Sequence, residues 1–239
     1  MKAFTKLKNY FTKFELLLWL CSVLFIVLSF LIFRGSNVLT LIASIIGITA
    51  ILICSKGNPI GQGLMIIFSC IYGIISYGYA YYGEMITYLG MSAPMALASL
   101  IAWLKNPYNG SKTEVKINTI SKKEMVFAIM LTALVTFAFY FILRVLGTSN
   151  LTISTISVTT SFLAVYLTFR RSPYFSLLYA FNDIVLMIMW ALASIDNYSY
   201  ISVVVCFAAF LANDLYCFIN WLKIRKRQQT NSEKPVEEN

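Results

Sequence analysis

The residues best suited to chemistry are two amide–acid pairs, Asn182-Asp183 and Asn213-Asp214, each inside a long apolar run that contains no basic residue. An acidic residue in the middle of a membrane costs about 2.5–3.5 kcal/mol on insertion scales, so it normally faces a cavity or a polar partner. Two such pairs without a basic partner predict a water-accessible site that binds a solute. Polar packing between helices, with each aspartate neutral or bonded to an amide, is the alternative interpretation.

Further polar and aromatic residues recur at helical intervals beside these pairs. Tyr179, Asp183 and Trp190 share one face of a helix through their i+4 and i+7 spacing. Asn213 and Asn220 form a stripe along the last apolar run. Because aromatic faces attract flat rings, and cationic rings most strongly, the pattern predicts a flat, polar and preferably cationic solute. A phosphate ester is disfavoured because the apolar runs contain no Lys or Arg.

Other polar residues of the apolar runs have a simpler interpretation. The Ser and Thr residues between positions 152 and 161 are more typical of helix packing than of a binding site. Trp103 and Trp221 lie at the ends of their runs, where an aromatic belt at the membrane surface explains them as well as substrate contact does. Glu84 is expected in a loop on the outer side.

Composition excludes several kinds of chemistry. The chain of 239 residues has no histidine, so histidine-ligated metals and Ser-His-Asp triads are excluded. Its five cysteines lie in apolar runs without a CxxC pair, which indicates buried small side chains rather than metal or redox sites. No glycine-rich phosphate-binding motif is present. We therefore expect no cofactor, no metal and no enzymatic activity.

The chain has too little polar surface for a water-soluble globule. It has 59% hydrophobic and 12% charged residues, against about 45–50% and about 25% in soluble domains. We predict an all-α polytopic membrane protein. Eight runs are long enough to cross a membrane as helices, namely 16–33, 38–54, 61–82, 85–104, 125–143, 151–169, 174–195 and 198–222.

The basic residues orient these spans. With the N-terminus inside, Arg34 and Arg144 are the two of the 19 basic residues that fall in outer loops. We therefore expect a multi-pass protein with both termini in the cytoplasm. The net charge of +9 is interpreted as a collar facing anionic lipid, and nucleic acid is not an expected partner. The basic segment 105–124 and the polar tail are expected to be solvated.

Two stretches of the chain correspond to each other, residues 37–105 and 150–223. Each begins with Asn, turns through a basic segment that ends in proline (Pro59 or Pro173), and ends in Trp-Leu-Lys. Both run from outside to inside, so the spans are expected as one accessory helix followed by 3+1+3 parallel repeats, with a substrate site between the repeats. The remaining segments are 1–36 with the accessory helix, 106–149 with a loop and linker helix, and the cytoplasmic tail 224–239. Chance matching is the alternative.

These residues resemble the PnuC family of bacterial nicotinamide riboside transporters, which are akin to duplicated SWEET-type carriers. In the first repeat the resemblance rests on Lys56, Gly63, Tyr72, Tyr82-Gly83-Glu84-Met85, Pro94 and Trp103. In the second it rests on Arg170-Arg171, Asn182-Asp183, Trp190, Asn213-Asp214 and Asn220-Trp221.

The resemblance implies a vitamin transporter of the bacterial plasma membrane. The expected substrate is unphosphorylated nicotinamide riboside, imported by facilitated diffusion and trapped by a cytoplasmic kinase. The resemblance also implies a homotrimer. Many members carry tryptophans where this chain has Ser176 and Tyr179, and Cys217 replaces a common glycine. Carriers of the same fold for thiamine, riboflavin or a deoxynucleoside are therefore the alternative.

The candidate substrate-binding residues are Asn182, Asp183, Trp190, Tyr179, Asn213, Asp214, Asn220, Trp103, Gln62 and Tyr72. A membrane scaffold without transport, or a membrane-embedded enzyme, is the alternative of a different class. A scaffold has no need of two buried amide–acid pairs, and the enzyme lacks any nucleophile–base pair.

Overall fold

The computed structural model describes residues 10–33, 38–78, 82–148 and 150–233. Asn37, which opens the first predicted repeat, and Arg34 lie outside the described residues. Within the described part of the chain, eight helices are long and apolar enough to cross a membrane, as predicted. Helices satisfy their own backbone hydrogen bonds, which lipid cannot do.

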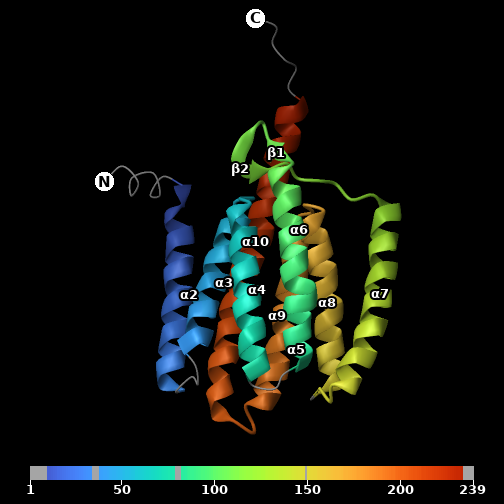
Figure 1. Cartoon of the computed structure of the whole chain (residues 1–239). Helices are drawn as coiled ribbons and strands as arrows, with labels where there is room; N and C mark the ends of the chain where they lie inside the picture. The colour runs from blue at the N-terminus through green and yellow to red at the C-terminus, as the bar shows by residue number, and fades with distance from the viewer. Residues whose placement is uncertain (1–9, 34–37, 79–81, 149, 234–239) are drawn as a thin grey trace, which may run out of the picture.

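The spans run roughly side by side (Figure 1). In chain order they are α2 (Lys13–Ile32), α3 (Val38–Ser55), α4 (Ile60–Gly78), a fourth span in three parts, α7 (Lys122–Val145), α8 (Leu151–Phe169), α9 (Tyr174–Ala193) and α10 (Ile201–Glu233). The fourth span consists of α5 (Tyr82–Ile86), the π-helical turn η1 (Thr87–Ser92) and α6 (Ala93–Leu104). A short 3-10 turn, η2 (Tyr198–Tyr200), precedes α10.

The helix contacts follow a pattern shared by two triplets. In one triplet α4 packs between α3 and α6, and in the other α9 packs between α8 and α10. The third helix of each triplet contacts the first helix of the other, α10 against α3 and α6 against α8. Helices α2 and α7 stand at opposite edges of the bundle (Figure 1). These contacts are the ones expected of triplets related by a two-fold axis, which remains our prediction for the repeat.

The turn after the first helix of each triplet has the same backbone. Gly57 and Arg171 both have left-handed conformations, with φ of 69° and 57°, and each donates its N–H to a carbonyl three residues back. A left-handed residue just after a helix end is a common way to cap it. The carbonyls of these two residues accept hydrogen bonds from Val115 N (2.9 Å) and Asn118 N (3.1 Å). The segment after α6 therefore reaches both triplets.

That segment is not simply a solvated loop, because it contains a small antiparallel hairpin. Strands β1 (Pro107–Tyr108) and β2 (Ser111–Val115) pair around Asn109-Gly110, and both turn residues have positive φ. Asn-Gly is the sequence most typical of a two-residue hairpin turn. Val115, the last residue of β2, is buried. We call this end of the bundle, where the hairpin and α10's extension lie, the hairpin end (Figure 1).

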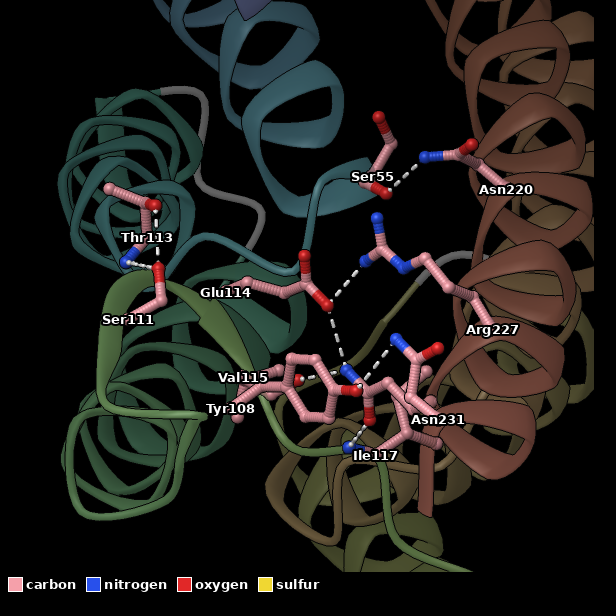
Figure 2. Close-up of polar contacts among 11 residues, drawn as sticks. Ser55, Tyr108, Ser111, Thr113, Glu114, Val115, Ile117, Asn220, Arg227 and Asn231 are labelled. Atoms are coloured by element: carbon pink, nitrogen blue, oxygen red, sulfur yellow. Dashed lines mark hydrogen bonds and ion pairs between the residues drawn. The ribbon is translucent and has the colours of Figure 1, made fainter. Parts of the chain in front are cut away.

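The tail expected from residue 224 is helical as far as it is described, because α10 continues to Glu233 and packs its polar side chains on the hairpin. Gln228 donates to Val115 O (3.0 Å) and Glu114 Oε1 (2.9 Å), and accepts from Ile117 N (2.9 Å). Arg227 pairs with Glu114 at 2.5 Å. Figure 2 shows these contacts, which we call the clasp. The clasp joins α10 to the segment that caps both triplets.

The accessory helix α2 is also held by polar contacts. Its buried Glu15 pairs with Lys56 (2.8 Å) and accepts from the Tyr216 hydroxyl (2.5 Å). Further along, Trp19 Nε1 donates to Thr49 Oγ1 at 3.1 Å. These bonds attach α2 to the rest of the bundle, although most of its other side chains are apolar and exposed.

We predict that Gln228→Ala lowers the thermal unfolding midpoint of the purified protein by about 4–8 °C. The change leaves the Val115 carbonyl and Ile117 N–H without their partner, at a cost of about 2 kcal/mol, and a protein of this size loses about 2–4 °C per kcal/mol. Gln229→Ala is the matched control, because Gln229 is the adjacent glutamine and is exposed. Equal midpoints for the two variants would contradict the clasp.

Candidate functional site

A cavity of about 100 Å³ lies between the two triplets, and we call it the chamber. Its walls come from α3, α4, the α5–η1–α6 span, α8, α9 and α10, with one residue of α7. The chamber brings together five of the ten predicted site residues: Gln62, Tyr179, Asn182, Asp183 and Asp214. It therefore unites residues that are 152 positions apart in the chain, as Gln62 and Asp214 are.

The central feature of the chamber is a pair of carboxyl groups. Asp183 of α9 and Asp214 of α10 are each 4% exposed, and both line the chamber. Ser176 Oγ donates to Asp214 Oδ1 at 3.2 Å. Asp183 Oδ2 is buried without a hydrogen-bond partner among the described residues.

The charge of the chamber is one-sided. Glu84 is a third carboxyl group in its wall, and no Lys or Arg is found among the described residues that line it. Attraction between opposite charges is strong where water is excluded, and an unpaired buried charge is costly. The chamber is therefore built to accept a cation and to reject an anion.

Asn182 is fixed by the neighbouring helix. Its Oδ1 accepts hydrogen bonds from Ser157 (3.1 Å), Thr160 (2.8 Å) and Ser161 (3.0 Å) of α8. These bonds hold the amide oxygen toward α8 and orient the whole side chain. The hydroxyls expected to serve packing thus divide into two groups. Thr159 does pack against α7, through Thr136 at 3.0 Å, whereas Ser154, Ser157 and Ser161 line the chamber.

The two tryptophans Trp103 and Trp221 lie outside the chamber and make matching contacts. Trp103 Nε1 donates to Thr168 O and Trp221 Nε1 to Cys54 O, both at 2.9 Å. Each indole therefore bonds the end of the first helix of the other triplet. Both are fully buried, their rings 5.2 Å apart, and Phe175 packs on both. This aromatic layer lies about two turns of α9 from Asp183, toward the hairpin end.

Three other predicted residues also lie outside the chamber lining. Asn213 donates to Ser22 Oγ of α2 at 2.8 Å, so it holds the accessory helix. Asn220 donates to Ser55 O at 2.7 Å, at the end of α3 (Figure 2). Tyr72 packs on Tyr88, behind the chamber wall, with ring centroids 4.6 Å apart and ring planes tilted by 45°.

A second cavity, of about 340 Å³, lies at the end of the bundle opposite the hairpin, and we call it the vestibule. The last predicted residue, Trp190, lines the vestibule, where its ring packs on Tyr200 with centroids 5.2 Å apart. The vestibule also contains Glu84 and Asp196. Five residues line both cavities: Gly83, Glu84, Thr148, Ser154 and Met189.

Glu84 is the site residue that sequence reasoning missed. It was expected in an outer loop, but it lies in the first turn of α5 and belongs to the fourth span. A signal was present in the sequence, because Glu84, Tyr88 and Ser92 recur every fourth residue and all three line the chamber. The predicted span began after Glu84 because a charged residue was taken as the limit of the apolar run, so the four-residue spacing was not recognised.

The comparisons with known proteins agree with this architecture. The model of a family described as "Nicotinamide mononucleotide transporter" matches residues 37–223. The nicotinamide riboside transporter PnuC of Neisseria mucosa is 25% identical over 220 residues, covering 90% of this chain and 83% of that protein. The transporter of the same name from Haemophilus influenzae is 26% identical over 190 residues, covering 79% and 81%.

Among solved structures, the crystal structure of the vitamin B3 transporter PnuC has a TM-score of 0.79 and 24% identity, covering 91% of this chain and 94% of that one. The fold is thus shared over nearly the whole length. The relatives are transporters rather than enzymes, in line with the expectation from the sequence. The chain is a multi-pass membrane protein that belongs to the nicotinamide mononucleotide transporter family, the family of the PnuC proteins.

Proposed function

We propose that this protein carries unphosphorylated nicotinamide riboside across the bacterial plasma membrane by facilitated diffusion. The observation that carries the proposal is the chamber with three carboxyl groups and no basic residue among its described lining. The family description names a mononucleotide, and the curated relatives are named for the riboside. The phosphate group of a mononucleotide would be repelled by the carboxylates of this chamber. The charge of the chamber therefore supports the riboside as substrate rather than the mononucleotide.

The riboside matches the chamber group by group. Its positively charged pyridine ring suits the Asp183–Asp214 pair, and tyrosine faces such as those of Tyr88 and Tyr179 attract a cationic ring. The ribose hydroxyls and the carboxamide can hydrogen-bond with Gln62 and with the serines of α8. The other five predicted residues have roles outside the chamber. Trp103 acts in closure and Trp190 in the vestibule. Packing is the role of the remaining three, Asn213, Asn220 and Tyr72.

Trapping follows from the same electrostatics. A cytoplasmic kinase that phosphorylates the riboside would convert a cation into a product with negative charges, which the carboxylates repel. Import would then proceed downhill without an ion gradient or nucleotide hydrolysis. We place both termini and the hairpin end in the cytoplasm on the distribution of basic residues. We also propose the homotrimer that the family resemblance implies, with a separate pathway in each protomer.

We predict that nicotinamide riboside raises the thermal unfolding midpoint of the purified protein and that nicotinamide mononucleotide does not. A ligand at 100 times its Kd stabilises the fold by about 2.7 kcal/mol. Thiamine, riboflavin and a deoxynucleoside belong in the same panel. Stabilisation by one of these instead of the riboside would reassign the cargo, and stabilisation by none would indicate a scaffold.

We predict saturable uptake of labelled riboside into proteoliposomes in the absence of any imposed ion gradient. The reason is that the riboside's own gradient suffices for a carrier that is not coupled to an ion. Uptake is measured with and without a proton gradient, and empty liposomes are the control. A strict requirement for the proton gradient would overturn facilitated diffusion.

We predict that Asp183→Asn weakens binding of nicotinamide riboside by about 10- to 100-fold, because contacts with a charged group are worth about 1.5–3 kcal/mol. The uncharged dihydronicotinamide riboside has nearly the same shape, and its affinity should change little. Glu124→Gln is the matched control, since Glu124 pairs with Arg170 at the surface and lines neither cavity. Equal losses for both ligands would show that charge is not what Asp183 recognises.

A further inference from the structure

The passage between the vestibule and the chamber contains an acidic residue to which the proposal above gives no separate role. Glu84 is the carboxyl group that lines both cavities, whereas Asp183 and Asp214 line the chamber and Asp196 lines the vestibule. A solute that moves from the vestibule to the aspartate pair therefore passes Glu84. No Lys or Arg is found among the described residues that line either cavity.

The carboxyl group of Glu84 has capacity left for a ligand. Its Oε2 is buried without a hydrogen-bond partner among the described residues. A buried carboxylate oxygen without a partner costs free energy, which a cation in contact with it would recover. No basic side chain is present in the described lining to play that part, which leaves it open to a cationic solute.

Side chains from α7 and from the turn after it pack closely against the α5 backbone beside Glu84. Gly83 precedes Glu84, and a Cβ at Gly83 would lie 2.6 Å from both Leu143 Cδ2 and Thr148 Oγ1. Glycine at this position therefore lets α5 lie close to the side chains of Leu143 in α7 and of Thr148 in the turn after it. Thr148 lines both cavities as well, so Glu84 and Thr148 lie on the same passage.

The π-helical turn η1 keeps Glu84 in line with the chamber. Glu84, Tyr88, Ser92 and Ala96 all line it at intervals of four residues. A regular α-helix turns about 100° per residue, so each four-residue step would overshoot by about 40° and the stripe would rotate away. The wider turn at Thr87–Ser92 offsets this drift. Such turns are rare and are often found at functional sites.

The vestibule offers the rest of a site for a cationic ring. Tyr82, Trp190 and Tyr200 supply aromatic faces, and Asp196 supplies a second carboxylate. Aromatic faces and carboxylates together attract a cationic ring more strongly than a neutral ring. The vestibule can therefore concentrate a cationic solute beside Glu84 before it reaches the aspartate pair.

We propose that Glu84 is a specificity-determining residue that binds the cationic ring in the passage and selects it from uncharged and anionic solutes before it reaches the chamber. This rests on the proposed function in one respect, since it takes the substrate to be a ring cation. Glu84 binds the solute as it enters from the vestibule, and the aspartate pair binds the solute once it occupies the chamber.

The test compares Glu84→Gln and Glu84→Asp with wild type in proteoliposomes. We expect Glu84→Gln to lower the initial uptake rate of nicotinamide riboside at low concentration at least 10-fold, while uptake of the uncharged dihydro compound changes less than 2-fold. Glu84→Asp keeps the charge and should restore most of the rate for the riboside. Glu124→Gln, which removes a carboxylate outside both cavities, should behave as wild type.

Other outcomes overturn the inference. Equal losses for the charged and uncharged compounds, or no loss for either, would show that Glu84 does not select charge. Thermal unfolding midpoints of the variants without ligand separate misfolding from lost selectivity, and Glu84→Asp provides a second readout if Glu84→Gln does not fold.

Failure of the proposed function has a different signature. If wild type transports thiamine and not nicotinamide riboside, the cargo is wrong. Glu84→Gln should then still reduce thiamine uptake at least 10-fold, because thiamine also carries a cationic ring, and unchanged thiamine uptake would overturn the role of Glu84.

Discussion

The burial of carboxyl groups without a basic partner is the constraint on which the rest of this structure depends. Asp183 and Asp214 lie in the middle of two apolar helices, where an isolated charge is expensive. A hydrogen bond from the Ser176 hydroxyl to Asp214 lowers that cost without removing it. Binding of a cation would offset the remaining cost, so the buried carboxyl groups form a candidate binding site.

The six helices of the two triplets isolate this pair from lipid. Each triplet packs its third helix on the first helix of the other, and the chamber lies where these contacts meet. The two peripheral helices do not share this task equally. Helix α2 is held by Glu15 and by Asn213, whereas α7 contributes Leu143 to the chamber wall.

The two ends of the chamber differ in how they are closed. Toward the hairpin, the Trp103 and Trp221 indoles cross between the triplets and bond the ends of α8 and α3. The clasp adds a second layer, because the segment after α6 caps both left-handed turns and is itself held by Gln228. At the opposite end Glu84 separates the chamber from a larger vestibule. The structure is therefore closed at one end and approachable at the other.

Matching turns of the two triplets are linked by one segment at the hairpin end. Arg171 adopts the left-handed conformation that glycine adopts at position 57, although an arginine side chain makes it less favourable. The hydrogen bond from Asn118 to the Arg171 carbonyl helps to hold that turn. The same segment bonds Gly57 through Val115, so a movement of one triplet against the other has to stretch or break this connection.

Several features could be predicted from the sequence because they follow from local patterns. Apolar run length and the absence of charge indicated the eight spans, and the Asn-Asp pairs indicated a polar centre. Asp183, Asp214, Asn182, Tyr179 and Gln62 do meet in one cavity. Periodicity also grouped Trp190 with Asp183, but eleven ångströms or so of helix separate residues seven apart, which places the tryptophan in the vestibule instead.

The sequence by itself determined which segments cross the membrane as helices, because lipid leaves the backbone no other way to satisfy its hydrogen bonds. It also determined that two aspartates need a polar environment. Only the tertiary structure decided which polar groups share that environment. Helical spacing gives the face of a side chain but not the neighbour opposite, so Glu84, the serines of α8 and the roles of Trp103 and Asn213 depend on contacts between distant helices.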